Sequence, residues 1–140
     1  MTLLLDADCC VDILRGRPPE VRATFLGRVV NEPVAISTIT LMELAFGIGR
    51  SHPARREKNR AALRLIRDAP VEIVAFDEED AEATGLLNAE LTTAGATIGA
   101  YDVQLAGQAL RRGWTVVTAN LRHFGRVRGL RLETWRPTPP

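Results

Sequence analysis

With 140 residues, 46% of them hydrophobic and 25% charged, and a net charge of +1, the chain has the length and composition of one soluble globular domain. It contains no run near the ~20 apolar residues that cross a bilayer and no basic segment ahead of Leu3–Leu5, so we expect a cytoplasmic protein without membrane contact. Its two cysteines, Cys9 and Cys10, are adjacent, which excludes a disulfide framework and the ligand spacing of a zinc finger.

Short apolar runs alternate with helical patterns along the whole chain. The expected elements are strand 3–5, helix 8–15, helix 20–30, strand 34–37, helix 41–48, helix 54–68, strand 71–76, helix 78–94, helix 102–112, strand 114–118 and strand 130–135, with a loop over 119–129. Asp8 is the expected cap of the first helix, and Gly47 and Gly49 are expected to end the third. This alternation with short connections predicts an α/β fold around an open, mostly parallel sheet.

The charges are unevenly distributed. Residues 50–67 and 107–136 are rich in arginine, whereas residues 68–102 contain acidic residues and no lysine or arginine. Arginine forms bidentate contacts with phosphate, so basic segments on either side of an acidic centre favour a polyanion that is held at its edges. Solvated helix faces with intramolecular ion pairs are the alternative interpretation.

Three carboxylates stand near the ends of predicted strands. Asp6 directly follows strand 3–5, Glu43 comes soon after strand 34–37, and Asp102 opens the helix after Gly99. The carboxyl ends of parallel strands face one crevice, where several carboxylates repel one another unless a cation neutralises them. Hard Mg²⁺ or Mn²⁺ prefers such oxygen ligands, so a metal-dependent reaction on a phosphate is the first hypothesis. Taken singly, each acid is equally typical of a helix cap or an exposed helical residue.

Two phosphate-handling families share part of this pattern. Leu3–Asp8 has the form of the nucleophile motif in haloacid-dehalogenase-like phosphohydrolases, which also need a lysine near the phosphate and a late acidic pair. The only lysine, Lys58, lies in a predicted basic helix, and no acidic pair follows Asp102. The same missing lysine argues against a response-regulator receiver domain.

Four ordered segments carry a more specific pattern. They are Leu4–Asp8 with Ile13–Gly16, Ala35–Gly47, Ile98–Asp102 with Leu105–Ala106, and Val116–Phe124 with Gly129–Trp135. In this order and spacing the chain resembles the PIN-domain ribonuclease toxins of the VapC type over Leu3 to Trp135. The resemblance implies a single domain over residues 1–136, with an open parallel sheet flanked by helices, and leaves residues 137–140 as a tail.

The resemblance also implies a Mg²⁺ or Mn²⁺ site. Asp6 and Asp102 are the expected direct ligands, and Glu43 would bind through water or orient the nucleophile. A fourth, often acidic family position falls near 118–124, where Asn120 or His123 stands, and we count Asn120 among the catalytic candidates. The family usually has asparagine where this chain has Asp8. Further residues expected around the ligands are Asp8, Ser37, Thr38 and His123, with Ser37 or Thr38 holding the water.

The expected reaction is cleavage of single-stranded or loop RNA, whose phosphates are accessible, by metal-activated water. Arg122, Arg126 and Arg128 are the candidate RNA-binding residues. The resemblance implies a type II toxin–antitoxin pair, with a cognate antitoxin resembling VapB as partner and a homodimeric toxin. The alternative is a PIN-like module that has lost cleavage and only binds RNA or a protein, an alternative motivated by Asp8 and the missing fourth carboxylate.

Overall fold

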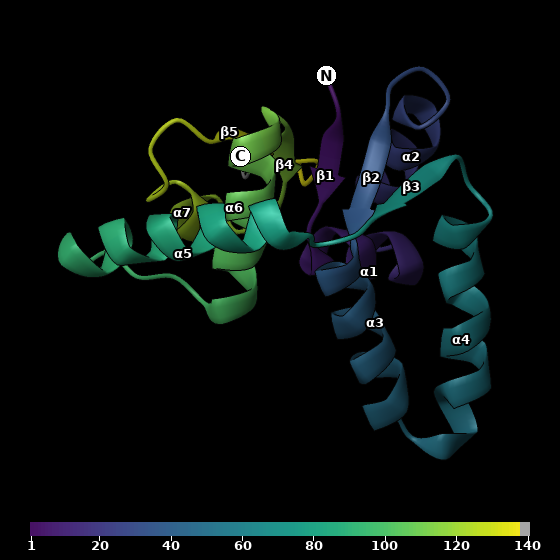
Figure 1. The fold of residues 1–140 in the computed structure, drawn as a ribbon. Coiled ribbons are helices and arrows are strands. Elements are labelled where there is room, and N and C mark those ends of the chain that lie inside the picture. The colour runs from purple at the N-terminus through teal and green to yellow at the C-terminus, as the bar shows by residue number, and fades with distance from the viewer. Residues whose placement is uncertain (138–140) are drawn as a thin grey trace.

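A five-stranded parallel sheet forms the centre of the molecule, in a computed structural model that describes residues 1–137 (Figure 1). Its strands are β1 (Leu3–Leu5), β2 (Val34–Ser37), β3 (Val71–Val74), β4 (Thr115–Val117) and β5 (Arg131–Glu133). They lie in the order β3-β2-β1-β4-β5, and Leu5 is level with Ile36 and Val117. The first strand is therefore central, and its carboxyl end is flanked by the ends of β2 and β4.

Helices cover both faces of the sheet. They are α1 (Ala7–Arg15), α2 (Pro19–Arg28), α3 (Thr38–Arg50), α4 (Pro53–Arg67), α5 (Glu78–Thr93), α6 (Ala100–Arg112) and α7 (Leu121–Phe124). Side chains of β1 alternate between the faces. Leu3 and Leu5 belong to a core with α1–α4, whereas Leu4 belongs to a second core with α5, α6 and α7. The predicted α/β fold with an open parallel sheet flanked by helices is confirmed.

Several predicted boundaries are wrong for local reasons. Asp6, not Asp8, caps α1, because its backbone is extended and its side chain accepts the N–H of Cys9. The third helix continues through Gly47 and Gly49 to Arg50, since helical glycine is tolerated where no left-handed residue is required. A short helix, α7, also lies inside the predicted loop 119–129. In Figure 1, α3 and α4 form a pair that extends beyond the carboxyl ends of the strands.

The helices α5 and α6 are joined by close packing and by an ion-pair network. A Cβ on Gly107 would lie 2.1 Å from the hydroxyl oxygen of Thr84, so the two helices meet at this glycine. Asp80 is 0% exposed and accepts from Arg111 at 2.9 Å and from Arg112 at 3.0 Å. Burial alone would raise the pKa of Asp80, but hydrogen bonds, the strongest from Arg112, lower it to about 2. The network fixes the start of α5 against the end of α6.

The carboxyl-terminal part of the chain returns to α1. Trp135 is buried in the same core as Leu3, and Arg136 pairs with Asp12 of α1. Of the predicted tail, residues 138–140 lie outside the described residues, and the domain bounds 1–136 remain a prediction. Within residues 1–137, no helix combines the length and the apolar character that crossing a membrane requires.

Candidate active site

The predicted carboxylates lie in one region, at the carboxyl end of the sheet. Asp6 follows β1 directly, Glu43 lies on α3, which begins where β2 ends, and Asp102 lies in the first turn of α6. The charge of Asp102 raises the pKa of both Asp6 and Glu43, and the charge of Asp8 raises the pKa of all three. Four carboxylates therefore share one region. The sequence predicts this for Asp6, Glu43 and Asp102, and it places Asp8 beside Asp6.

Asp6 is the most buried member of this group, with 4% of its surface exposed. Its Oδ1 accepts the backbone N–H of Cys9 at 2.8 Å, and its Oδ2 accepts the hydroxyl of Thr118, the residue that follows β4. Burial raises the pKa of Asp6 to about 7, although these two hydrogen bonds act in the opposite direction. The side chain is thus held in a fixed orientation by two neutral donors, and the nearby Arg136, whose pKa Asp6 helps to raise, forms its ion pair with Asp12 instead.

Glu43 and Asp102 are half-buried, and for both of them burial is the largest cause of a raised pKa. After burial, the pKa of Asp102 is raised by Asp8 and lowered by His123. None of the ion pairs within residues 1–137 includes any of the four carboxylates. The region is therefore a concentration of negative charge without an ion pair, and only the weaker charge effects of Arg136 and His123 act on it.

This donor set fits a hard divalent cation by its chemistry. Carboxylate oxygens are the preferred protein ligands of Mg²⁺ and Mn²⁺, and the mutual repulsion of Asp6, Glu43 and Asp102 is relieved by a cation. In the part of the chain that the structure describes, no three acidic, histidine or cysteine side chains already converge as ligands of one ion. Binding an ion at this place therefore requires the side chains to draw together.

The segment between β4 and α7 connects the other candidates to Asp6. The hydroxyl oxygen of Thr118 donates to Asp6 and accepts the backbone N–H of Asn120 at 2.9 Å. Asn120 caps α7: its Oδ1 accepts the backbone N–H of His123 at 3.4 Å, and its Nδ2 lies 2.9 Å from Nδ1 of the same imidazole. The sequence reasoning missed Thr118, although its position after a strand adjacent to β1 is the signal that could have identified it.

Ser37 and Thr38 have structural partners. Ser37 is 0% exposed and caps α3 by accepting the N–H of Ile39 at 3.1 Å. Thr38 accepts the N–H of Phe76 at 3.1 Å, which ties the start of α3 to the segment after β3. Each hydroxyl keeps its own hydrogen for donation, so the predicted contact with a water remains a prediction.

The candidate RNA-binding arginines differ from one another. Arg122 and Arg128 are exposed and make no hydrogen bond or ion pair with another described residue, whereas Arg126 donates to the carbonyl of Thr97 at 2.7 Å. Several acidic residues that could have paired with them use other arginines instead: Glu133 accepts from Arg28 at 2.8 Å, and Asp77, Glu79 and Asp80 pair with Arg111. Arg122 and Arg128 are therefore available to a polyanion, and Arg126 also has a structural contact.

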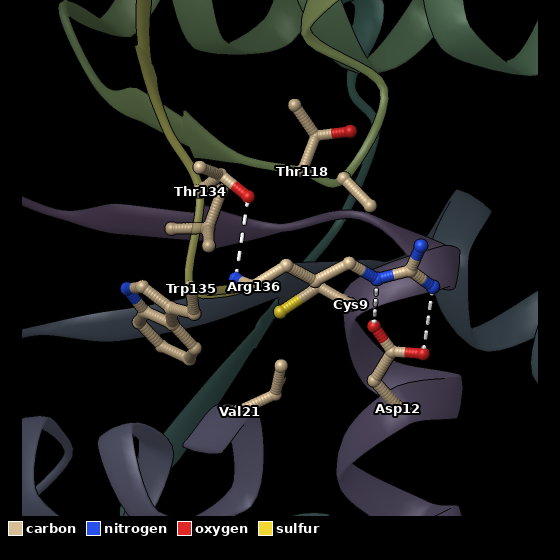
Figure 2. Close-up of a pocket in the computed structure, with 9 residues that line it drawn as sticks. Cys9, Asp12, Val21, Thr118, Thr134, Trp135 and Arg136 are labelled. Carbon is tan, nitrogen blue, oxygen red and sulfur yellow. Dashed lines mark hydrogen bonds and ion pairs between the residues drawn. The ribbon is translucent and has the colours of Figure 1, made fainter. Parts of the chain in front are cut away.

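Cys9 and Thr118, which both donate to Asp6, line a small hollow that leaves no room for a water molecule (Figure 2). Arg136 crosses it and forms two hydrogen bonds with Asp12, Nε to Oδ2 at 2.7 Å and Nη2 to Oδ1 at 3.0 Å. Cys9 also lines it, and burial raises the pKa of its thiol, so the sulfur stays protonated and unreactive. The side chains around the hollow are closely packed, and they support Cys9, whose backbone N–H donates to Asp6.

Comparisons with known proteins agree in sequence and in fold. The family model of the PIN domain matches residues 3–130. A Salmonella typhimurium protein named tRNA(fMet)-specific endonuclease VapC is 36% identical over 135 residues, which cover 96% of this chain and 98% of that protein. A structure of VapBC2 from Rickettsia felis, bound to a promoter DNA fragment, matches with a TM-score of 0.88 at 30% identity, covering 97% of this chain and 100% of that one. DNA-bound VapBC from Salmonella typhimurium matches with a TM-score of 0.86 at 35% identity, covering 97% and 99%.

Proposed function

Because this chain belongs to the PIN-domain family, we propose that it is an endoribonuclease that needs a divalent cation and acts as the toxin of a type II toxin–antitoxin pair. The observation that carries the proposal is the group formed by Asp6, Glu43, Asp102 and Asp8, which shares one region and forms no ion pair with a described residue. Such a group attracts a cation, and a cation there attracts a phosphate.

Each carboxylate has a distinct role in this proposal. Asp6 and Asp102 would bind Mg²⁺ or Mn²⁺ directly, and Glu43 would orient the attacking water. When bound, the ion would stabilise charge on the scissile phosphate and lower the pKa of water. Thr118 keeps Asp6 in place through its hydroxyl, and Asp8 adds negative charge near the entrance, since it is exposed.

The substrate class proposed is RNA with accessible phosphates in single strands or loops. The name of the Salmonella typhimurium relative makes tRNA(fMet) the first substrate to test. The exposed Arg122 and Arg128 would hold the strand next to the acidic group, because guanidinium groups form charge-assisted hydrogen bonds with phosphate.

Cleavage of RNA by the purified chain tests the proposal. The chain should cut RNA with Mg²⁺ or Mn²⁺ and lose that activity in EDTA. Asp102→Asn should reduce the rate at least ~10²-fold, in line with losses at positioned electrostatic groups, with the fold retained. Glu90→Gln, an exposed acid on α5, is the control with the same change of charge. Undiminished cutting in EDTA would contradict the metal requirement, and RNA binding without any cutting would favour the non-cleaving module.

The proposed partner is a cognate antitoxin, as in the VapBC complexes of the related structures. An acidic group of this kind attracts a cationic side chain, so we expect an arginine or lysine of the antitoxin within hydrogen-bonding distance of Asp6, Glu43 or Asp102. A homodimer of the toxin within a hetero-oligomer is part of this proposal. A fully inhibited complex whose antitoxin lies away from all three carboxylates would contradict inhibition by direct blockade.

A further inference from the structure

The capping contacts of Asn120 determine which nitrogen of His123 carries a proton. The backbone N–H of His123 is a donor and lies 3.4 Å from Oδ1 of Asn120, so the side-chain oxygen must face it. The reverse orientation of the amide would place two donors against each other. This leaves Nδ2 of Asn120, which can only donate, 2.9 Å from Nδ1 of the imidazole. Nδ1 therefore accepts, and the proton of the neutral ring lies on Nε2.

The Nε2–H group of His123 has no hydrogen-bond partner among the described residues. No hydrogen bond or ion pair of Nε2 is present within residues 1–137, and the side chain of His123 is half-buried. The ring is close enough to Asp102 to lower the pKa of that carboxyl. On the other side, hydrogen bonds through Asn120 and Thr118 link the ring to Asp6. The imidazole is thus near Asp102 and is linked to Asp6 through Asn120 and Thr118, with one donor unused.

We propose that His123 is a catalytic residue that donates Nε2–H to a non-bridging oxygen of the scissile phosphate, and that Asn120 is the positioning residue that fixes its tautomer. This inference rests on the proposed ribonuclease function. A carboxylate at the fourth family position would act on the cation, whereas a neutral N–H donor acts on the phosphate itself. No proton is transferred: the hydrogen bond strengthens as negative charge grows on the oxygen. The tautomer also excludes His123 as a metal ligand, because a ligating nitrogen has no proton.

Nitrogen-15 NMR of histidine tests the tautomer independently of activity. The chain contains two histidines, so His52→Asn leaves only His123, and asparagine retains the cap of α4. Under alkaline conditions, where imidazoles are neutral, we expect a protonated Nε2 and a bare Nδ1, with or without Mg²⁺. Adding Asn120→Asp should place a proton on Nδ1, because a carboxylate only accepts. A protonated Nδ1 in the chain with Asn120, or loss of the Nε2 proton when Mg²⁺ is added, would overturn the assignment.

Kinetics test the role of the donor. His123→Phe keeps a flat ring without a donor and should lower kcat by ~10²-fold with KM nearly unchanged, whereas His123→Gln, which keeps an N–H donor, should recover most of the rate. His52→Asn should cleave like the wild-type chain. Equal cleavage by wild type and His123→Phe would contradict the role of His123 alone. Equal loss in His123→Phe and His123→Gln, with lower thermal stability in both, would also overturn it. A wild-type chain that cuts no RNA contradicts the proposed function itself.

Discussion

Replacing Asp6 by asparagine should stabilise the metal-free chain at neutral and alkaline pH. The folded chain holds a proton on Asp6 with a pKa of about 7, against an ordinary value of 3.8, so it binds this proton more tightly than the unfolded chain. Stability therefore falls as the pH rises from about 4 to about 7, and the loss is complete above that range. A difference of about three pH units corresponds to roughly 4 kcal/mol as an upper magnitude.

Asparagine removes the charge but keeps the local structure. Its Oδ1 can still accept from Cys9 as the cap of α1, and its amide group can donate to Thr118, whose hydroxyl also accepts. In EDTA at pH 8 we expect Asp6→Asn to melt ~10 °C higher than wild type, with the gap closing near pH 4. Adding Mg²⁺ or Mn²⁺ should stabilise wild type and leave the variant almost unchanged, because only the charged carboxylate gains from the ion.

Asp12→Asn is the matched control for this measurement. Asp12 lies on the same helix and is buried to the same degree, at 5% exposed, but it accepts two hydrogen bonds from Arg136. Its neutralisation should destabilise the fold by ~1–3 kcal/mol, the cost of removing a partner from a charged hydrogen bond. An Asp6→Asn variant that is less stable than wild type in EDTA at pH 8 would refute the reasoning, because the charge of Asp6 would then be compensated within the fold.

Three further measurements test the packing, the ion-pair network and the charge map. Gly107→Ala should lower the free energy of unfolding, measured in urea, by ~1–3 kcal/mol, because the added Cβ clashes with α5. Gly85→Ala should not lower it, because a Cβ there meets nothing within 4 Å; equal effects of the two changes would contradict the close approach of α5 and α6. Asp80→Asn should lower the free energy of unfolding by ~2 kcal/mol at neutral pH. The difference from wild type should shrink as the pH falls towards 2, because Asp80 of the wild type then becomes neutral as well; a difference that does not change with pH would contradict this. Replacing Arg122 and Arg128 by glutamine should reduce the slope of the logarithm of RNA affinity against the logarithm of salt concentration by ~1–2, and it should leave Mg²⁺ affinity intact. An unchanged slope would show that neither arginine contacts phosphate.

The sheet and the acidic group were predictable because both follow from position along a strand. An apolar run followed by an acid, as at Leu3–Asp6, marks a buried parallel strand and the crevice at its carboxyl end. The same reasoning predicted that Glu43 and Asp102 lie near Asp6, and the charge of Asp102, which raises the pKa of both Asp6 and Glu43, agrees with it. The resemblance to PIN-domain toxins is confirmed by the match over residues 3–130.

The connections within the site were not predictable, since they depend on tertiary contacts. Asp6 and Asp8 are equally good caps in sequence, and only the extended backbone of Asp6 after β1 decides between them. Thr118 and Asn120 gain their roles because β4 lies beside β1, which no local pattern specifies. Likewise, α7 has four residues, too few for a hydrophobic period to be recognised.

The distribution of arginine explains why one buried aspartate is left without a positive partner. Asp6, Asp12 and Asp80 are each at most 5% exposed. Asp12 pairs with Arg136 and Asp80 with two arginines, whereas Asp6 accepts only from neutral donors, a backbone N–H and a hydroxyl. A buried charge without an ion-pair partner costs stability, and the hydrogen bonds from Thr118 and Cys9 offset only part of that cost, since the pKa of Asp6 stays at about 7. A cation from outside the chain, either a metal ion or a basic side chain of a partner, would offset this cost. The lack of an ion pair at Asp6 therefore favours both the metal-bound, active state and the antitoxin-bound, inhibited state that we propose.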